Sequence, residues 1–315
     1  MKEKLAFLKA GTIAKSMNAE VGLVTFRDGI ASTYDGATSC RIPLDIGHDV
    51  SVRLFTLSRA VAVLGEGFAI KKMTANLQLS NDGVKIHVPF LVNNEEGYTA
   101  SRGAKIDVPE GFAEAVRAVL PFSEVTPRDF TACVHISDGY ALATSGNTVA
   151  RYPLDTSFLE GRSLTIDAQS LSALVRMDLE KVSYSDSTLT GYEGERLLSV
   201  SLSACRFPCV KKLFGYDSGE PVDIDPATVA ACRTASSLDS GSLPTLTFTD
   251  GLVSTGGESP DCSMAIQRGL GEGKYSSSKI LAVLSKSEKI AMKSGEPSNF
   301  SAGKLQGVTI GMRAN

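Results

Sequence analysis

The sequence DGYALATSG at residues 138–146, which continues into RYPL at 151–154, decides the fold because it recurs along the chain. Residues 28–36 read DGIASTYDG and continue into RIPL at 41–44, so Asp-Gly, a later Gly, Arg, Pro and Leu repeat at an offset of 110 residues. A third copy, DGLVSTGG at 250–257, keeps the Asp-Gly pair and the Thr-Gly that follows. Three copies in a chain of 315 residues indicate three related units.

Each copy is typical of a hairpin, because Gly readily adopts the positive φ that a tight two-residue Asp-Gly turn requires. A segment with helical spacing of apolar residues stands before each meander of strands. Helices are expected over residues 3–16, 56–64, 110–120 and 168–176, from Pro226, and through Ile280 to Lys286, with N-caps at Thr56, Asp167 and the serines 276–278. The pattern predicts six strand-helix-three-strand units in three pairs. The first unit has almost no residues before its helix, so its leading strand is expected to be missing or very short.

The composition indicates a globular protein, since 43% of the residues are hydrophobic and no run approaches the ~20 apolar residues that cross a bilayer. We therefore expect a soluble cytoplasmic protein without a membrane partner. The six cysteines are scattered and the three histidines are isolated, so we expect free thiols, no metal site and no cofactor. A formal net charge of −3 argues against coating nucleic acid through bulk charge, although local charge can differ.

Enzymatic chemistry is not indicated by the sequence. It contains no Gly-rich phosphate loop, no His-Glu metal spacing and no Gly-x-Ser-x-Gly nucleophile elbow. A non-enzymatic protein is therefore favoured over a hydrolase or transferase. A structural or virion protein built from repeated β domains, without a role on DNA, remains the alternative.

Three short motifs resemble the bacterial sliding clamp family, the β subunit of DNA polymerase III. ATSGNTVA at 143–150 is similar to the family's Ala-Thr-Asp-Gly-His-Arg-Leu-Ala signature, although Ser145 replaces the acidic residue. Phe207-Pro208 followed by Leu213-Phe214 resembles the Phe-Pro segment that enters the third domain, and IGMR at 310–313 resembles the Met-Pro-Met-Arg ending. The chain looks like a short, divergent member such as a phage could carry.

The resemblance implies an α+β fold of three DNA-clamp domains at residues 1–103, 104–217 and 218–315, each with two strand-helix-three-strand units. Helices would line a ring and sheets would form its outside. Closure would take a head-to-tail homodimer, since six domains complete the ring. Such a ring holds double-stranded DNA without reading its sequence, and a diffuse positive lining suffices for this.

The basic residues on the expected helices are the candidates for that lining, although for any one of them an ordinary surface charge is about as probable. They are Lys4, Lys9, Lys15, Arg59, Arg117, Arg176, Arg233, Lys279 and Lys286.

The resemblance also implies a pocket between the second and third domains, where the polymerase and the clamp loader insert short hydrophobic peptide motifs. The matching positions are all apolar: Phe130, Val149, Leu213, Phe214, Val308, Ile310 and Met312. Apolar residues suit aliphatic and aromatic anchors, and Met adapts to varied partners. For Val149 and Val308, a place in the core is an equal alternative.

Overall fold

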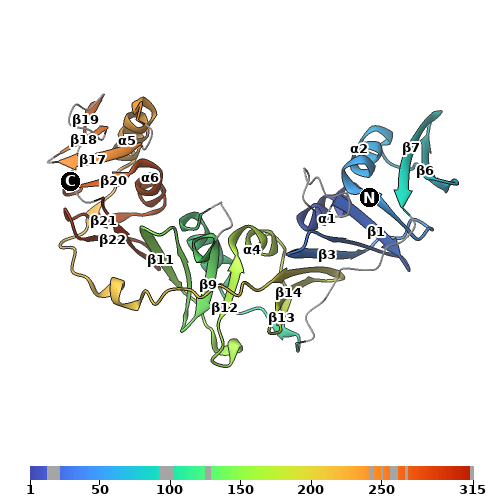
Figure 1. Cartoon of the computed structure of the whole chain (residues 1–315), viewed down its shortest axis with the longest axis horizontal. Helices are drawn as coiled ribbons and strands as arrows, with labels where there is room; N and C mark the ends of the chain where they lie inside the picture. The colour runs from blue at the N-terminus through green and yellow to red at the C-terminus, as the bar shows by residue number, and fades with distance from the viewer. Residues whose placement is uncertain are drawn as a thin grey trace. The chain divides into compact units, whose positions relative to one another are not determined.

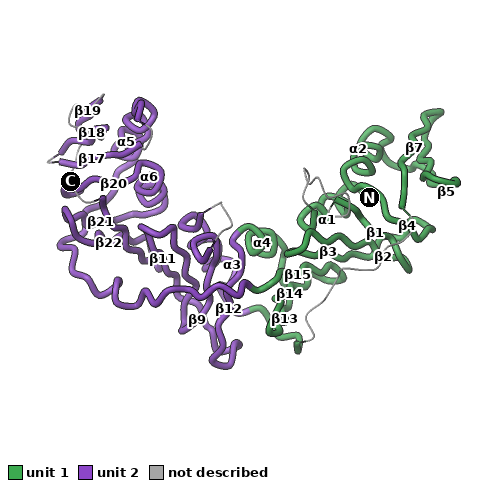
Figure 2. Tube along the Cα trace, in the orientation of Figure 1, with its two compact units in different colours: residues 1–108, 169–202 green, residues 109–168, 203–315 purple. Residues whose placement is uncertain are grey.

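The computed structural model describes residues 1–12, 22–91, 103–124, 129–241, 244–249, 251–255, 262–266 and 269–312 (Figure 1). It divides into two compact units, residues 1–108 with 169–202 and residues 109–168 with 203–315 (Figure 2). The division runs through the expected middle domain, so the three domain boundaries stay a prediction.

Unit 1 holds one antiparallel sheet. Its elements are α1 (Lys2–Leu8), η1 (Lys9–Gly11), β1 (Leu23–Arg27), β2 (Ile30–Tyr34), β3 (Thr38–Pro43), β4 (Val50–Arg53), α2 (Leu54–Leu64), β5 (Ala69–Lys72), β6 (Asn76–Asn81), β7 (Val84–Leu91), β8 (Ile106–Asp107), most of α4 (Ala168–Leu174), β13 (Lys181–Tyr184), β14 (Thr188–Glu193) and β15 (Arg196–Ser201). The strand order in the described residues is β5-β6-β7-β4-β1-β2-β3-β15-β14-β13-β8.

Unit 2 holds two antiparallel sheets. Its elements are α3 (Phe112–Val119), η3 (Leu120–Phe122), η4 (Phe130–Ala132), β9 (Cys133–Ser137), β10 (Tyr140–Thr144), β11 (Thr148–Pro153), η5 (Ser157–Leu159), β12 (Leu164–Asp167), η6 (Lys211–Gly215), β16 (Val222–Asp223), α5 (Pro226–Leu238), β17 (Thr245–Thr249), β18 (Leu252–Thr255), β19 (Ser263–Ala265), β20 (Gly273–Ser276), α6 (Ser277–Lys286), β21 (Lys289–Ala291), β22 (Pro297–Ala302) and β23 (Leu305–Ile310). The orders are β12-β9-β10-β11-β23-β22-β21-β16 and β19-β18-β17-β20. The α+β prediction is confirmed.

The expected hairpin turns are present. Asp28 and Gly29 both have positive φ, 50° and 75°, and so do Asp138 and Gly139, 51° and 83°. Positive φ at both central residues is the geometry of the two-residue hairpin, and Asp and Gly are the residues that tolerate it. The repeat in the sequence is therefore a repeat of turns in the fold.

The repeat extends to sheet order. Three four-strand groups run β4-β1-β2-β3, β12-β9-β10-β11 and β20-β17-β18-β19, and two more run β8-β13-β14-β15 and β16-β21-β22-β23. In all three pairs of units, the strand before the second helix pairs with the first meander: β4 with β1, β12 with β9, and β20 with β17. In the second and third pairs, the strand before the first helix pairs with the second meander: β8 with β13, and β16 with β21. The remaining group, β5-β6-β7, has no leading strand among the described residues, as the sequence predicted.

The helix boundaries differ from those expected. The first expected helix is replaced by α1 and η1, and its remainder from residue 13 lies outside the described residues. The chain turns away at Gly11 because it passes against the sheet, where a Cβ would meet Thr33 Oγ1 at 2.6 Å. Thr56 is not an N-cap: α2 begins at Leu54, which is buried directly after β4, and Arg53 occupies the N-cap position.

One further expectation about a helix end was wrong. Helix α4 ends at Leu174, so Arg176 lies in the turn that follows it. Val175 N–H still bonds to the Leu171 carbonyl, but the N–H groups of Arg176 and Met177 bond to carbonyls three residues back, so the helix tightens and ends there. The serines at 276–278 do place the N-cap of α6 at Ser276, but no side chain caps the helix. Pro226 begins α5 as expected, and Asp225 caps it.

Candidate functional site

The candidate site is built where β11 pairs with β23, which joins the second repeat to the last strand of the chain. Val149 lies directly opposite Val308, and Thr148 lies opposite Thr309 with their hydroxyl oxygens 2.9 Å apart. The two valines are buried, with 5% and 2% of their surfaces exposed. They are therefore part of the joint itself rather than of an open surface.

The two faces of this joint differ. On one face the ring of Phe300 lies over Gly307 and stacks on Phe122 of η3, with ring centroids 5.3 Å apart. Side chains alternate along a strand, so Val308 and its partner Val149 face the opposite side.

The second face is covered by the connector, defined as residues 203–216. The guanidinium of Arg151 lies 4.0 Å from the Phe214 ring centroid and 4.7 Å from that of Tyr140. Asn299 Nδ2 donates a hydrogen bond of 2.7 Å to the carbonyl of Tyr216. These contacts hold η6, with Leu213 and Phe214, against the face that carries the two valines.

Exposed apolar surface remains beside the connector. Ile310 and Met312 are 42% and 39% exposed, while Leu213 and Phe214 are half-buried. Tyr216, 50% exposed, lies at the end of the connector, where its carbonyl is bonded to Asn299, and it was not among the sequence candidates. We call Leu213, Phe214, Ile310 and Met312 the outer apolar surface.

Phe130 contacts a different part of the connector. Its ring meets Phe207 edge-on at 6.2 Å, and Phe207 stacks on His135 at 4.8 Å with an interplanar angle of 3°. Burial lowers the pKa of His135 below its usual value, and its Nδ1 lies 2.8 Å from Thr165 Oγ1. Phe130 therefore anchors the start of the connector rather than the outer apolar surface.

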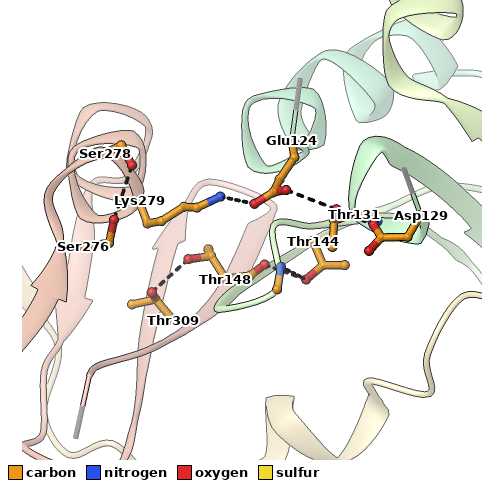
Figure 3. A network of polar contacts seen from close by, with 10 residues as sticks. Glu124, Asp129, Thr131, Thr144, Thr148, Ser276, Ser278, Lys279 and Thr309 are labelled. Atoms are coloured by element: carbon orange, nitrogen blue, oxygen red, sulfur yellow. Dashed lines mark hydrogen bonds and ion pairs between the residues drawn. The ribbon is translucent and has the colours of Figure 1, made fainter. Parts of the chain in front are cut away.

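A hollow of about 350 Å³ lies near the same joint, lined by Pro121, Phe122, Ser123, Glu124, Ser145, Thr148, Ser278, Lys279 and Ala282. Lys279 of α6 donates to Glu124 Oε1 at 2.7 Å beside it, and Thr131 donates to Glu124 Oε2 at 3.3 Å (Figure 3). The hydroxyl and backbone N–H of Thr131 also bond to Asp129 and lower the pKa of that carboxyl. The sequence reasoning did not find this hollow, because it is made by turns and helix ends far apart in the chain.

Among the nine candidate basic residues, Lys4 and Lys279 are half-buried and bonded within the fold. Lys4 Nζ donates to the Pro43 carbonyl at 2.7 Å, and Lys279 is paired with Glu124. Lys15 lies outside the described residues.

The other six candidate basic residues are exposed: Lys9, Arg59, Arg117, Arg176, Arg233 and Lys286. Arg233 of α5 donates to Ser285 of α6 at 3.0 Å, next to Lys286, so the structure brings these two cations onto adjacent helices. Arg59 lies over the exposed ring of Phe55 at 5.3 Å. Whether any of them contacts DNA stays a prediction.

In the part of the chain that the structure describes, no group of three His, Cys, Asp or Glu side chains is placed to hold a metal ion. No helix in these residues has the length and apolar character to span a membrane.

Comparison by sequence finds neither a protein-family model nor a curated protein that matches this chain. Comparison of structures does. A DNA polymerase sliding clamp from Bacillus subtilis superposes with a TM-score of 0.80 at 13% identity, covering 100% of this chain and 97% of that one. This chain has the sliding-clamp fold. A sliding clamp from Pseudomonas aeruginosa aligns at 0.79 and 14% identity over 99% and 97% of the chains. The Helicobacter pylori β clamp, solved with a DNA ligase peptide, aligns at 0.76 and 11% identity over the same shares. The fold expectation drawn from the short motifs is thereby confirmed along nearly the whole chain.

Proposed function

We propose that this chain is a DNA sliding clamp, a non-catalytic processivity factor that closes around duplex DNA in the cytoplasm and tethers a polymerase. The clamp fold supports this, and so does the way its repeats are joined. Twice within the chain, the third strand of one meander pairs with the third strand of a later meander. These pairs are β3 with β15, and β11 with β23. Two joints of one kind imply a rule for the third.

The two joints share a register. Cys40 lies opposite Leu198 in the first joint, and Ala150, at the repeat offset of 110 residues, lies opposite Gly307 in the second. Leu198 and Gly307 are each the third residue of their strand, counted from a two-residue hairpin turn. The joint is therefore set by equivalent positions in the repeat.

The third joint would link two copies of the chain. Strand β19 is the equivalent of β3 and β11, and β7 is the equivalent of β15 and β23. In the described residues β19 ends its sheet, and β7 pairs with β4 only at Phe90 and Leu91. Unpaired strand edges invite pairing, and Val84 and Leu91 at the ends of β7 are 48% and 47% exposed. We infer that β19 of one copy adds to β7 of another, and two such joints close a head-to-tail homodimer.

The register rule gives the partner residues. Leu252 and Ile30 each follow the Asp-Gly pair of the sequence repeat. Ala265 lies opposite Leu252 as Pro43 lies opposite Ile30, so Cys262, three residues before Ala265, is the equivalent of Cys40. Ile86 is the third residue of β7. We therefore expect Cys262 of one copy opposite Ile86 of the other, and Ser263 opposite Lys85.

The outer apolar surface is the proposed site for short hydrophobic motifs of the polymerase and the clamp loader. Its exposed Ile310 and Met312 offer apolar contact beside half-buried Phe214. The peptide-bound Helicobacter pylori clamp shows that a protein of this fold binds a partner peptide. We further propose that Lys9, Arg59, Arg117, Arg176, Arg233 and Lys286 face duplex DNA and contact its phosphates without reading bases.

Mass in solution tests the proposal. The expected value is twice 33.3 kDa. Lys85→Pro should shift the protein towards the monomer, because Lys85 turns its N–H away from β6 and proline removes that donor from the joint. A chain that stays at 33.3 kDa at micromolar concentration, or a Lys85→Pro variant with an unchanged dimer, would refute the ring.

A further inference from the structure

The open edge of β5 is a feature that neither the ring nor the outer apolar surface uses. In the two equivalent groups this edge is covered by a two-residue strand: Ile106-Asp107 pairs with β13, and Val222-Asp223 pairs with β21. Each covering strand is an aliphatic residue followed by Asp, and each Asp is paired with a Lys, at 2.8 Å for Lys181 and 3.8 Å for Lys289.

The register identifies the corresponding residues of β5. Counted from the hairpin turns that follow, Ile70 occupies the position of Val182 and Ile290, and Ala69 occupies the position of the two lysines. Val182 and Ile290 have no exposed surface, whereas Ile70 is only half-buried. Among the described residues, no strand lies along the outer edge of β5. Ile70 is thus partly exposed at a place that the same chain covers twice elsewhere.

The backbone groups at this edge can be assigned. Met73 N–H bonds to the Asn76 carbonyl. Because the backbone groups of successive residues in a strand point to opposite sides, those of Ile70 and Lys72 point away from β6. Lys72 confirms this direction, because its N–H donates to His48 Nε2 at 3.2 Å. His48 therefore ends the edge at Lys72. The N–H and C=O of Ile70 lie inside it and point away from β6.

The charge at this edge is positive. Lys71 and Lys72 are exposed on β5. Neither lysine has an ion-pair partner among the residues that the structure describes, and Lys72 Nζ lies 5.3 Å from the Phe90 ring centroid. Asp82, in the β6–β7 turn, is the acidic residue of the hairpin. An acidic strand would therefore be drawn to this edge.

We propose that the β5 edge binds an extended acidic segment of a partner protein by strand addition. The segment pairs antiparallel with β5, with an aliphatic residue opposite Ile70 and a carboxylate one residue earlier, opposite Lys71. Backbone bonds to Ile70 supply the affinity, and the aliphatic and acidic side chains supply the selectivity. The chain's own covering strands are the precedent for the aliphatic residue; their Asp lies one residue later, opposite the position of Ala69, whereas the lysine of β5 is Lys71. The proposal does not depend on ring formation.

Binding of capped hexapeptides to the full chain, followed by NMR or fluorescence polarisation, tests this. The probe carries one isoleucine flanked by glutamates, and the control peptide carries lysines instead. The glutamate peptide should bind with saturation and perturb β5 and β6, and the lysine peptide should not bind. Equal binding of both peptides, or no binding of either, would overturn the proposal.

Two variants locate the site. Ile70→Pro removes the outward N–H at a position where an edge strand tolerates proline, and it should weaken binding by about 5-fold or more. Lys71→Glu replaces a cross-strand attraction by a repulsion and should weaken it by roughly 5- to 10-fold. Lys304→Glu, the same charge change in an exposed turn of unit 2, is the matched control and should leave binding unchanged. If Ile70→Pro binds normally, or if it abolishes self-association instead, the partner segment is not the occupant of this edge.

Discussion

Gly307→Ala tests the packing that holds β11 and β23 together. A Cβ built at Gly307 would lie 1.9 Å from Phe300 Cζ, and within 2.5 Å of two further atoms of that ring. The ring cannot retreat freely, because it is buried and stacks on Phe122 at 5.3 Å. The added methyl must therefore push the ring off the sheet or part the strands.

The magnitude follows from two opposing terms. Overpacking a buried site costs about 1–3 kcal/mol, and replacing glycine gains about 0.4–1 kcal/mol by restricting the unfolded chain. Because the added Cβ would lie 1.9 Å from a ring that is fixed by stacking, the overpacking cost belongs at the upper end of its range. The net loss is then about 2–2.6 kcal/mol, which corresponds to roughly 4–10 °C in the melting temperature of a unit of this size. Thermal unfolding followed by circular dichroism measures it.

Two other glycines provide graded controls. At Gly191 the nearest atoms are methyl groups of Leu179 and Leu174, at 2.5 and 2.9 Å, and these flexible ends can shift, so Gly191→Ala should cost less. At Gly215 no atom lies within 4 Å, and Gly215→Ala should be neutral or slightly stabilising. If Gly307→Ala melts at or above the temperature of Gly215→Ala, the described packing of Phe300 on the joint is incorrect.

Three other predictions concern pH, partners and DNA. Burial lowers the pKa of His135 from its usual 6.5, so the stability that this neutral histidine contributes is present above pH 6.5 and is lost as the pH falls through the lower folded-state pKa. His135→Phe should therefore reduce the dependence of the melting temperature on pH between pH 7 and pH 5, and an unchanged slope would exclude His135 as the cause. Met312→Asp should weaken polymerase stimulation about 10-fold or more while the dimer mass is kept. Leu252→Asp is its control, because Leu252 on β18 is exposed to a similar extent. Stimulation that survives Met312→Asp would mean that the outer apolar surface is not the partner site. Replacing Arg233 and Lys286 together by Glu should reduce the slope of log K for DNA against log salt by about 2, whereas Lys304→Glu should not alter it; identical slopes would mean that the two cations are ordinary surface charges.

The repeat made much of the fold predictable from sequence. Asp-Gly turns depend on local backbone freedom, so Asp28-Gly29 and Asp138-Gly139 could be placed without a structure. Val149 and Val308 were assigned to one site from separate ends of the chain, and they lie opposite each other. That assignment came from the resemblance to the clamp family. Both valines are buried in the joint, so their place in a partner pocket stays a prediction.

Features set by distant contacts were not predictable. The end of α1 depends on the close passage of Gly11 by Thr33, and the start of α2 depends on the burial of Leu54 directly after β4. The pairing of Lys279 with Glu124 joins residues 155 positions apart, and no helical pattern indicates it. A basic residue on an amphipathic helix can therefore be assigned to a surface from sequence, but its partner cannot.

Covalent closure of the ring on DNA tests the central claim most directly. The variant carries Ile86→Cys together with Cys209→Ser, which removes an exposed competing thiol, and keeps the native Cys262. Residues opposite each other in a pair without hydrogen bonds lie about 4.5 Å apart between Cα atoms, which suits a disulfide. The protein is oxidised with nicked circular duplex DNA and then denatured in detergent. The account predicts a covalent dimer that stays with the circle, is released when the DNA is cut, and does not form with Cys262→Ser. Failure of residues 86 and 262 to cross-link, or equal retention on circular and linear DNA, would contradict it.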